Sequence, residues 1–302
     1  MNDERLENPL TPLAILFVLL SALFHSAWNF LSKRGNWPIE FFFLVFLSGT
    51  LFYIPLFIVL GAFPFPTETI YQKLWFFSSL SGFVQTVYFI CLIKAYRVGD
   101  LSLIYPISRS YPLLTLIWAI LLIREILSIQ GAIGILLVTF GIFVMFIPNL
   151  RPRPPLPQPN SHNLQTHLYL FAAVFTGSFV SLIDKVGLQL IQPVYYTWLI
   201  NFWMGIYTGV FILFRRGGTL SKIWQDSKGE VLMIAALQNL SYFSFLMALQ
   251  MSKVSYTVAF RQVGAVFGAI LGVVFLRESH WKMRIAGASI LTLGLLLIGL
   301  AK

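Results

Sequence analysis

The sequence predicts an all-α integral membrane protein in which ten transmembrane helices form two inverted five-helix repeats. Three observations support this prediction: an apolar composition, a series of long apolar runs, and an internal repeat. Of the 302 residues, 58% are hydrophobic and 11% are charged, and the mean hydropathy is +0.80. Soluble domains carry roughly 25% charged residues, so this much apolar surface requires a lipid environment.

Long apolar runs bounded by charged residues, proline or glycine mark the expected spans. A helix needs about 20 apolar residues to cross the hydrocarbon core of a bilayer. Ten runs satisfy this requirement. They predict helices at roughly 12–33, 39–61, 72–96, 101–123, 128–148, 166–188, 193–214, 229–251, 254–276 and 281–300.

The internal repeat relates residues 95–145 to residues 248–298 without a gap, at an offset of 153 positions. The matched pairs include Ala95 with Ala248, Ser102 with Ser255, Arg124-Glu125 with Arg277-Glu278, Gly134 with Gly287, Gly141 with Gly294, and Gln85 with Gln238. Five spans per copy is an odd number, so the copies enter the bilayer in opposite orientations, as in secondary transporters. The predicted units are residues 1–148, a proline-rich linker at 149–165, and residues 166–302.

The net charge of +10 comes from basic residues that lie mostly in short loops between the apolar runs. This distribution indicates membrane topology and argues against nucleic-acid binding. Lys and Arg are more frequent on the side that holds the linker, so the positive-inside rule places both termini outside and the linker in the cytoplasm. Cys91 is the only cysteine, which excludes an intrachain disulfide and a thiol metal site.

Arg109 and Arg261 are the leading candidate substrate-binding residues, because each lies inside a predicted span. At about 1.5 Å per residue, Arg109 is about 12 Å and Arg261 about 10 Å from the start of its span. A mid-membrane arginine costs about 2.5–3.5 kcal/mol on insertion scales. Two guanidinium groups at nearly matching repeat positions predict a site for a carboxylate, phosphate or phosphonate. Internal hydrogen bonding and snorkelling to the interface are the alternatives.

Carboxylates are expected only near the ends of the spans. Four carboxylates near span ends are Asp100, Asp184, Glu125 and Glu278. An internal ion-pair partner for the two arginines is therefore not evident. A proton-coupled exporter of cationic drugs is disfavoured, because such a carrier needs a carboxylate inside the membrane.

The two copies differ in the residues that shape spans 4 and 9. Pro106 and Pro112 bracket Arg109, and proline can kink a helix and free a carbonyl group. The second copy has Ala259 and Ala265 at the aligned positions, so the two halves are expected to bend differently. The second copy carries instead a ridge of three glycines, Gly264, Gly268 and Gly272. Such a ridge favours close packing within the monomer, with a homodimer seam as the alternative.

The repeated segments read AYRVGDLSLIYPISRSYPLLTLIWAILLIREILSIQGAIGILLVTFGIFVM and ALQMSKVSYTVAFRQVGAVFGAILGVVFLRESHWKMRIAGASILTLGLLLI. Both resemble the second part of an EamA domain of the drug/metabolite transporter (DMT) superfamily: a short turn, a small-residue-rich helix ending in Glu, and Gly-rich final helices. The resemblance implies a basket of ten helices that works by alternating access. Its central cavity would be lined by spans 4 and 9 with parts of spans 1, 3, 6 and 8. This chain departs from the pattern at Arg124 and Arg277, which stand where the family usually has glycine.

Further polar residues on the expected cavity-lining spans complete the candidate substrate-binding set. They are Gln85, Gln238, His25, Asn29, Tyr105 and Tyr242. Gln85 and Gln238 stand out because the repeat relates them. His25 is a candidate proton relay, because the unperturbed imidazole titrates near neutral pH. Interhelical hydrogen bonding is the alternative role for these residues.

The function predicted from these features is a secondary transporter, a permease or exporter for a small anionic or zwitterionic metabolite. Export of amphipathic drugs or amino acids is the alternative, and a membrane-embedded enzyme or a non-transporting scaffold is less favoured. The sequence has neither a phosphate-binding Gly-Lys-Ser/Thr loop nor a cluster with metal-ligand spacing, so we expect no cofactor and no enzymatic activity. The expected partners are the metabolite and the lipid bilayer, and the expected location is the bacterial cell membrane.

The distribution of Lys and Arg generates a prediction for the orientation of the chain. A reporter tag fused after Lys302 is expected on the non-cytoplasmic side, because the positive-inside rule places the more basic loops in the cytoplasm. Protease accessibility of the tag in intact cells measures this directly. A tag protected until the membrane is permeabilised would mean the opposite orientation.

Overall fold

The computed structural model describes residues 10–35, 37–60, 68–98, 107–146, 161–214, 220–267 and 281–301. Within these ranges the secondary structure is helical and contains no β-strand. The helices are α1 (Pro12–Gly35), α2 (Ile39–Leu60), α3 (Glu68–Val98), α5 (Tyr111–Ile123), α6 (Ile129–Phe146), α7 (Ser161–Gly187), α8 (Pro193–Phe214), α9 (Leu220–Met251), α10 (Val254–Phe260) and α12 (Trp281–Gly299). The predicted all-α fold class is confirmed.

The helices are apolar around most of their circumference, which is a property of membrane spans. Large apolar side chains such as Val59, Leu213 and Phe214 are exposed on the helix surface, where lipid would cover them. The described residues contain eight helices long and apolar enough to cross a membrane, and a shorter apolar helix, Tyr111–Ile123. A continuous helix satisfies its own backbone hydrogen bonds in the absence of water. The chain is therefore an integral membrane protein.

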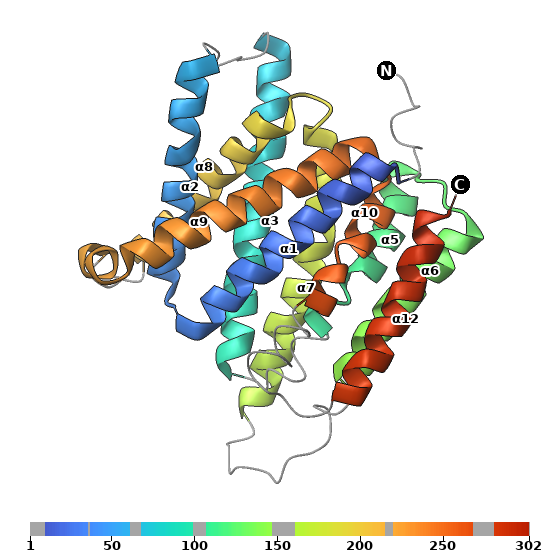
Figure 1. Ribbon diagram of the computed structural model, residues 1–302. Coiled ribbons are helices and arrows are strands. Elements are labelled where there is room, and N and C mark those ends of the chain that lie inside the picture. The colour runs from blue at the N-terminus through green and yellow to red at the C-terminus, as the bar shows by residue number, and fades with distance from the viewer. Residues whose placement is uncertain are drawn as a thin grey trace.

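Packing between the helices follows the internal repeat (Figure 1). Helix α3 packs against α7, and α1 packs against α9. Exchanging the two halves converts the first of these contacts into the second, because α1 corresponds to α7 and α3 to α9. The same exchange leaves two other major pairs unchanged, α2 with α8 and α6 with α12, because the helices in each pair correspond to each other. This pattern is what two related halves joined about a pseudo-two-fold axis require.

The α6–α12 pair illustrates how closely equivalent helices approach each other at this axis. A Cβ atom added to Gly141 would lie 2.6 Å from the Leu291 backbone nitrogen and 2.7 Å from the Gly287 carbonyl oxygen. A Cβ atom added to Gly134 would lie 2.8 Å from the Gly294 carbonyl oxygen. The repeated glycines therefore serve contact between the backbones of two helices, as small residues do in membrane proteins.

The two ends of the described chain lie at the same end of the molecule (Figure 1). Leu10 and Ala14, at the start of α1, share a buried cluster with Ile298 and Ala301, at the end of α12. An even number of membrane crossings between these points would give this result.

Spans 4 and 9 differ from the continuous helices expected at 101–123 and 254–276. The backbone turns at Arg109 and Ser110 before α5 begins, and it turns again at Arg261 and Gln262 after α10. Each turn contains hydrogen bonds between residues three apart, from Ser110 N to Ile107 O (3.0 Å) and from Gln262 N to Ala259 O (3.0 Å). Both candidate arginines thus occupy the first residue of a helix break.

The second half also contains a helix break, although it lacks the prolines of the first half. Alanine at 259 and 265 does not prevent the turn at Arg261. Gly264, just after the turn, lies against Ala22 and Ser26 of α1: an added Cβ would be 3.2 Å from Ser26 Oγ. Close packing within the monomer therefore accounts for this glycine. Gly268, Gly272 and Pro106 lie outside the described residues.

Arg124 ends helix α5 in the left-handed conformation, with φ 54° and ψ 38°. Glycine adopts this conformation without steric cost, whereas a residue with a Cβ atom does not. The geometry therefore favours glycine at position 124.

Replacing Arg124 with glycine is expected to stabilise the protein by about 1 kcal/mol, because it removes the left-handed strain. Thermal unfolding in detergent would show a midpoint raised by a few degrees. Arg124→Ala is the matched control, since it removes the same exposed side chain and keeps the Cβ atom. Equal midpoints for the two variants would contradict the strain argument.

Candidate functional site

The imidazole of His25 lies between the two arginines of the broken helices. His25 is about 20 Å along α1 from Pro12, near the middle of that span. Its Nε2 atom is 3.3 Å from Nη2 of Arg109, and its Nδ1 atom is 3.4 Å from Nη2 of Arg261. The ring is also packed edge-on against Trp28, with 5.1 Å between the centroids. The structure therefore brings together both sequence-predicted arginines and the predicted histidine at membrane depth.

Helix α9 supplies the remaining contacts of Arg261. Its Nη2 atom donates to Ser241 Oγ at 3.3 Å, and its guanidinium carbon lies 4.3 Å from the centre of the Phe245 ring. Ser241 Oγ in turn donates to the Ser21 carbonyl of α1 at 2.9 Å. The Nε atom of Arg261 is buried without a hydrogen-bond partner. Arg261 is therefore held by neutral groups and keeps one donor available.

The arrangement concentrates positive charge around a single neutral ring. A neutral imidazole has only one nitrogen that can accept a hydrogen bond, so only one of the two guanidinium contacts can be a hydrogen bond at any time. Within the described residues, no carboxylate lies at salt-bridge distance from Arg261. An oxyanion beside Arg261 would accept hydrogen bonds from its guanidinium group and supply a negative charge there.

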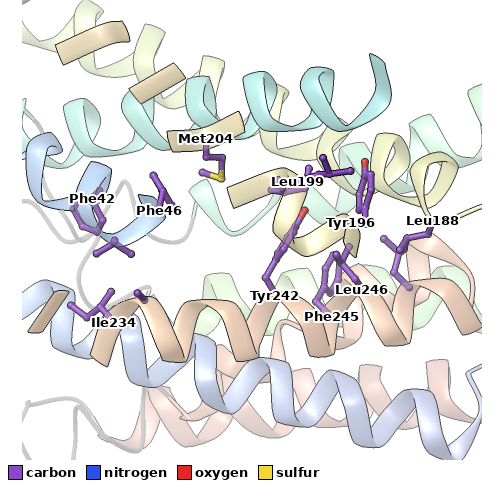
Figure 2. Packing of buried hydrophobic residues seen from close by; sticks show 14 of the residues in the cluster. Phe42, Phe46, Leu188, Tyr196, Leu199, Met204, Ile234, Tyr242, Phe245 and Leu246 are labelled. Carbon is purple, nitrogen blue, oxygen red and sulfur yellow. The ribbon is translucent and has the colours of Figure 1, made fainter. Parts of the chain in front are cut away.

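Gln85 and Tyr242 belong to a second polar cluster, centred on Asp184 of α7. Asp184 accepts hydrogen bonds from Ser81 Oγ and Tyr242 Oη, each at 2.5 Å. Gln85 Nε2 donates to the same two hydroxyl groups, at 3.1 Å to Ser81 and 2.7 Å to Tyr242. Figure 2 shows Tyr242 extending from α9 with its hydroxyl pointing away from that helix, in the same buried cluster as Tyr196.

Asp184 corrects the expectation that every carboxylate lies near a membrane surface. It is three residues from the end of α7, as the sequence indicated, but its side chain is fully buried. Its partner Ser81 lies about 16 Å along α3 from Ile70, near the middle of that span. The carboxylate is therefore enclosed by α3, α7 and α9 at membrane depth, and the lack of such a carboxylate no longer argues against a proton-coupled exporter of cations.

The other sequence-predicted residues have separate positions. Asn29 donates to the carbonyl of His25 in its own helix at 2.7 Å, so its amide is used locally. Gln238 lies one helical turn before Tyr242 on α9, and its Oε1 atom is buried without a hydrogen-bond partner. Tyr105 lies outside the described residues.

Glu125 positions α10, the short helix that directly precedes Arg261. Its carboxylate accepts hydrogen bonds from the backbone nitrogens of Val254 (3.1 Å) and Ser255 (3.4 Å), and also from the Ser255 hydroxyl. Two lysines hold the same region through carbonyl groups. Lys253 Nζ donates to Ile126 O at 2.6 Å, and Lys185 Nζ donates to Leu249 O at 2.7 Å. Burial raises the pKa of Glu125, and hydrogen bonds from Ser255 oppose this shift.

Comparisons with known proteins agree with this architecture. Two related halves, paired about a pseudo-two-fold axis with polar residues at helix breaks, are features that many membrane transporters share. The sequence pattern of the EamA-like transporter family matches residues 12–147 and 164–300. The chain therefore belongs to the EamA-like transporter family, and it is a membrane transporter of the DMT type.

A solved structure titled only "Crystal structure of protein" shares the fold, with a TM-score of 0.74 and 14% sequence identity. The alignment covers 94% of this chain and 95% of that chain. No curated protein matches this sequence.

Sequence reasoning did not select four residues that the structure places in these clusters: Ser81, Asp184, Ser241 and Phe245. Asp184 carried a signal, because a charged residue inside an apolar run is rare, and its closeness to a span end weakened that signal. Ser81, Ser241 and Phe245 are ordinary residues of membrane helices. Only their three-dimensional contacts distinguish them.

Removing the Glu125 carboxylate is expected to destabilise the protein by about 1–3 kcal/mol, because Glu125→Ala leaves buried backbone donors of α10 without an acceptor. Chemical unfolding in detergent measures the loss. Glu125→Gln keeps a carbonyl oxygen and should lose less.

The pH dependence provides a second test of the Glu125 contact. Because the folded-state pKa is raised, the folded protein binds the proton more tightly than the unfolded chain does. Stability should therefore decrease as the pH rises from the ordinary glutamate pKa through the raised one. An unchanged pH slope in Glu125→Gln would contradict this assignment.

Proposed function

We propose that this transporter carries a small anionic or zwitterionic metabolite by alternating access, and that Arg109 and Arg261 bind the anionic group. We also propose that the protein resides in the bacterial cell membrane. The observation that supports it most strongly is the contact of both guanidinium groups with the His25 ring at membrane depth. A charge at membrane depth is costly, and a carboxylate or phosphate bound at Arg261 would offset that cost.

Two buried hydrogen-bonding atoms without a partner, one on Arg261 and one on Gln238 of α9, fit a substrate with both acceptor and donor atoms. The free Nε–H of Arg261 can donate to an oxyanion. The buried Oε1 of Gln238 can accept from an ammonium or hydroxyl group. A buried polar atom without a partner is costly, so a ligand that satisfies both groups gains affinity and specificity.

The two helix breaks supply a physical basis for alternating access. α5 and α10 pack against each other, and each is preceded or followed by a turn that bears an arginine. Broken helices expose backbone and side-chain polar groups only where they line a site inside the protein. Rocking of one half against the other would open this site to each side of the membrane in turn.

Substitution of either arginine is expected to reduce uptake at least tenfold, because losing a charge-assisted hydrogen bond costs about 1.5–3 kcal/mol. Purified protein in liposomes would be tested with radiolabelled phosphate, malate, glutamate, leucine and choline. Arg109→Ala and Arg261→Ala should lose uptake of an anionic or zwitterionic probe. The lysine variants should retain part of it, since lysine keeps the charge without the bidentate geometry.

Lys222→Ala is the matched control, because it removes a positive charge from an exposed position on α9. Its uptake should equal that of the wild type. Normal uptake by both arginine-to-alanine variants would contradict the anion site. Uptake of choline alone would support a cation exporter instead.

A further inference from the structure

The Asp184 cluster is a buried titratable site that anion binding alone does not use. Asp184 is fully buried and is surrounded by hydroxyl groups. Within the described residues, no lysine or arginine lies at salt-bridge distance from it. The neighbouring Lys185 is directed elsewhere, to the carbonyls of Leu249 and Ser252. The negative charge of ionised Asp184 is therefore stabilised by hydrogen bonds and not by a direct counter-ion.

Both protonation states of Asp184 have physical support at this position. Two hydroxyl donors stabilise the carboxylate form. Burial in a low-dielectric environment stabilises the neutral acid. Ser81 and Tyr242 can also accept a hydrogen bond from the acid after their hydroxyl groups rotate. The site can therefore bind and release a proton without rearranging the helices.

Tyr242 links this carboxylate to the proposed anion site. Its two α9 neighbours, Ser241 and Phe245, both contact Arg261, at 3.3 Å and 4.3 Å. Asp184 and Arg261 interact electrostatically, and water screens such an interaction little inside the membrane. An ionised Asp184 lowers the positive potential at Arg261, and protonation of Asp184 restores it.

We propose that Asp184 is a proton-binding site coupled to the anion site, so that the protein moves a proton and an anion in the same direction. This proposal rests on the proposed function. The proton passes from bulk water to one carboxylate oxygen and returns to water on the other side, with no covalent or redox step. An anion at Arg261 repels ionised Asp184, so anion and proton each strengthen the binding of the other, as reciprocal linkage requires.

The surrounding groups are consistent with a single titrating carboxylate. The titratable or charged neighbours are Tyr242 from α9, Tyr196 from α8, and Arg261 after α10. Helix α3 contributes Ser81 and Gln85, which do not titrate. Helix α5 contributes Tyr111, which interacts electrostatically with Arg261, and Lys185 is the adjacent residue on α7 itself. His25 of α1 contacts Arg261, and the two guanidinium groups beside its ring oppose a positive charge on it. Phenols and guanidinium groups keep their charge state near neutral pH, so Asp184 is the group that changes charge as the pH falls.

The test compares anion uptake into proteoliposomes with and without an acidic exterior, at fixed membrane potential. The probe is phosphate, malate or glutamate, whichever shows uptake that depends on Arg261. In the wild type, the acidic exterior should raise the initial rate about fivefold, the lower end of typical coupling between sites. In Asp184→Asn this ratio should fall to one, because asparagine has no proton to exchange.

Asp226→Asn is the matched control, because it makes the same substitution at an exposed position on α9, and it should keep the fivefold ratio. Retention of that ratio in Asp184→Asn would overturn the proposal. A wild-type ratio of one, with uptake still lost in Arg261→Ala, would overturn the proton site and leave the anion site standing.

A second measurement covers the case in which Asp184→Asn does not fold. Infrared difference spectra between acidic and neutral pH should show the carbonyl stretch of a protonated carboxyl group in the wild type. Tyr242→Phe, which removes one hydrogen bond to the carboxylate, should shift the midpoint of that band toward higher pH. An unshifted midpoint would contradict the assignment of the band to Asp184.

Discussion

A charged group at membrane depth must obtain from the protein the partners that water would otherwise provide. Arg261 obtains them from His25 of α1 and from Ser241 and Phe245 of α9. These contacts require α1, α9 and the break after α10 to meet at one point. The close packing of α1 against α9 and of Gly264 against α1 serves that requirement. The geometry of the second half is therefore organised around one guanidinium group.

The duplication supplies the scaffold, and differences between the copies supply the chemistry. The repeat relates Asp184 to Ser32 at an offset of 152, and Tyr242 to Phe89 at an offset of 153. Only one of the two equivalent places therefore holds a carboxylate and a phenol. A symmetric backbone can present the same opening to both sides of the membrane, while the asymmetric side chains give the site a positive and a negative region.

The sequence predicted the features that hydropathy and repetition encode, which are the all-α membrane class and the two family repeats. It did not predict the turn at Arg261, because alanine and glycine allow a helix to continue and only packing against α1 and α9 shows that it stops. The sequence also predicted that Asp184 lies near a membrane surface, whereas the structure places its side chain at membrane depth. Depth depends on where neighbouring helices lie, and the middle of α3 stands beside the end of α7.

The charges in the two clusters suggest why substrate and proton would move together. Asp184 and Arg261 interact electrostatically, so an ionised Asp184 opposes the arrival of an anion at Arg261. Reorienting a site through a low-dielectric barrier costs least when the enclosed charge does not grow. An anion at Arg261 adds negative charge, and a proton on Asp184 removes one negative charge. The buried carboxylate would thus let the site offset the charge of a monovalent anion with one proton.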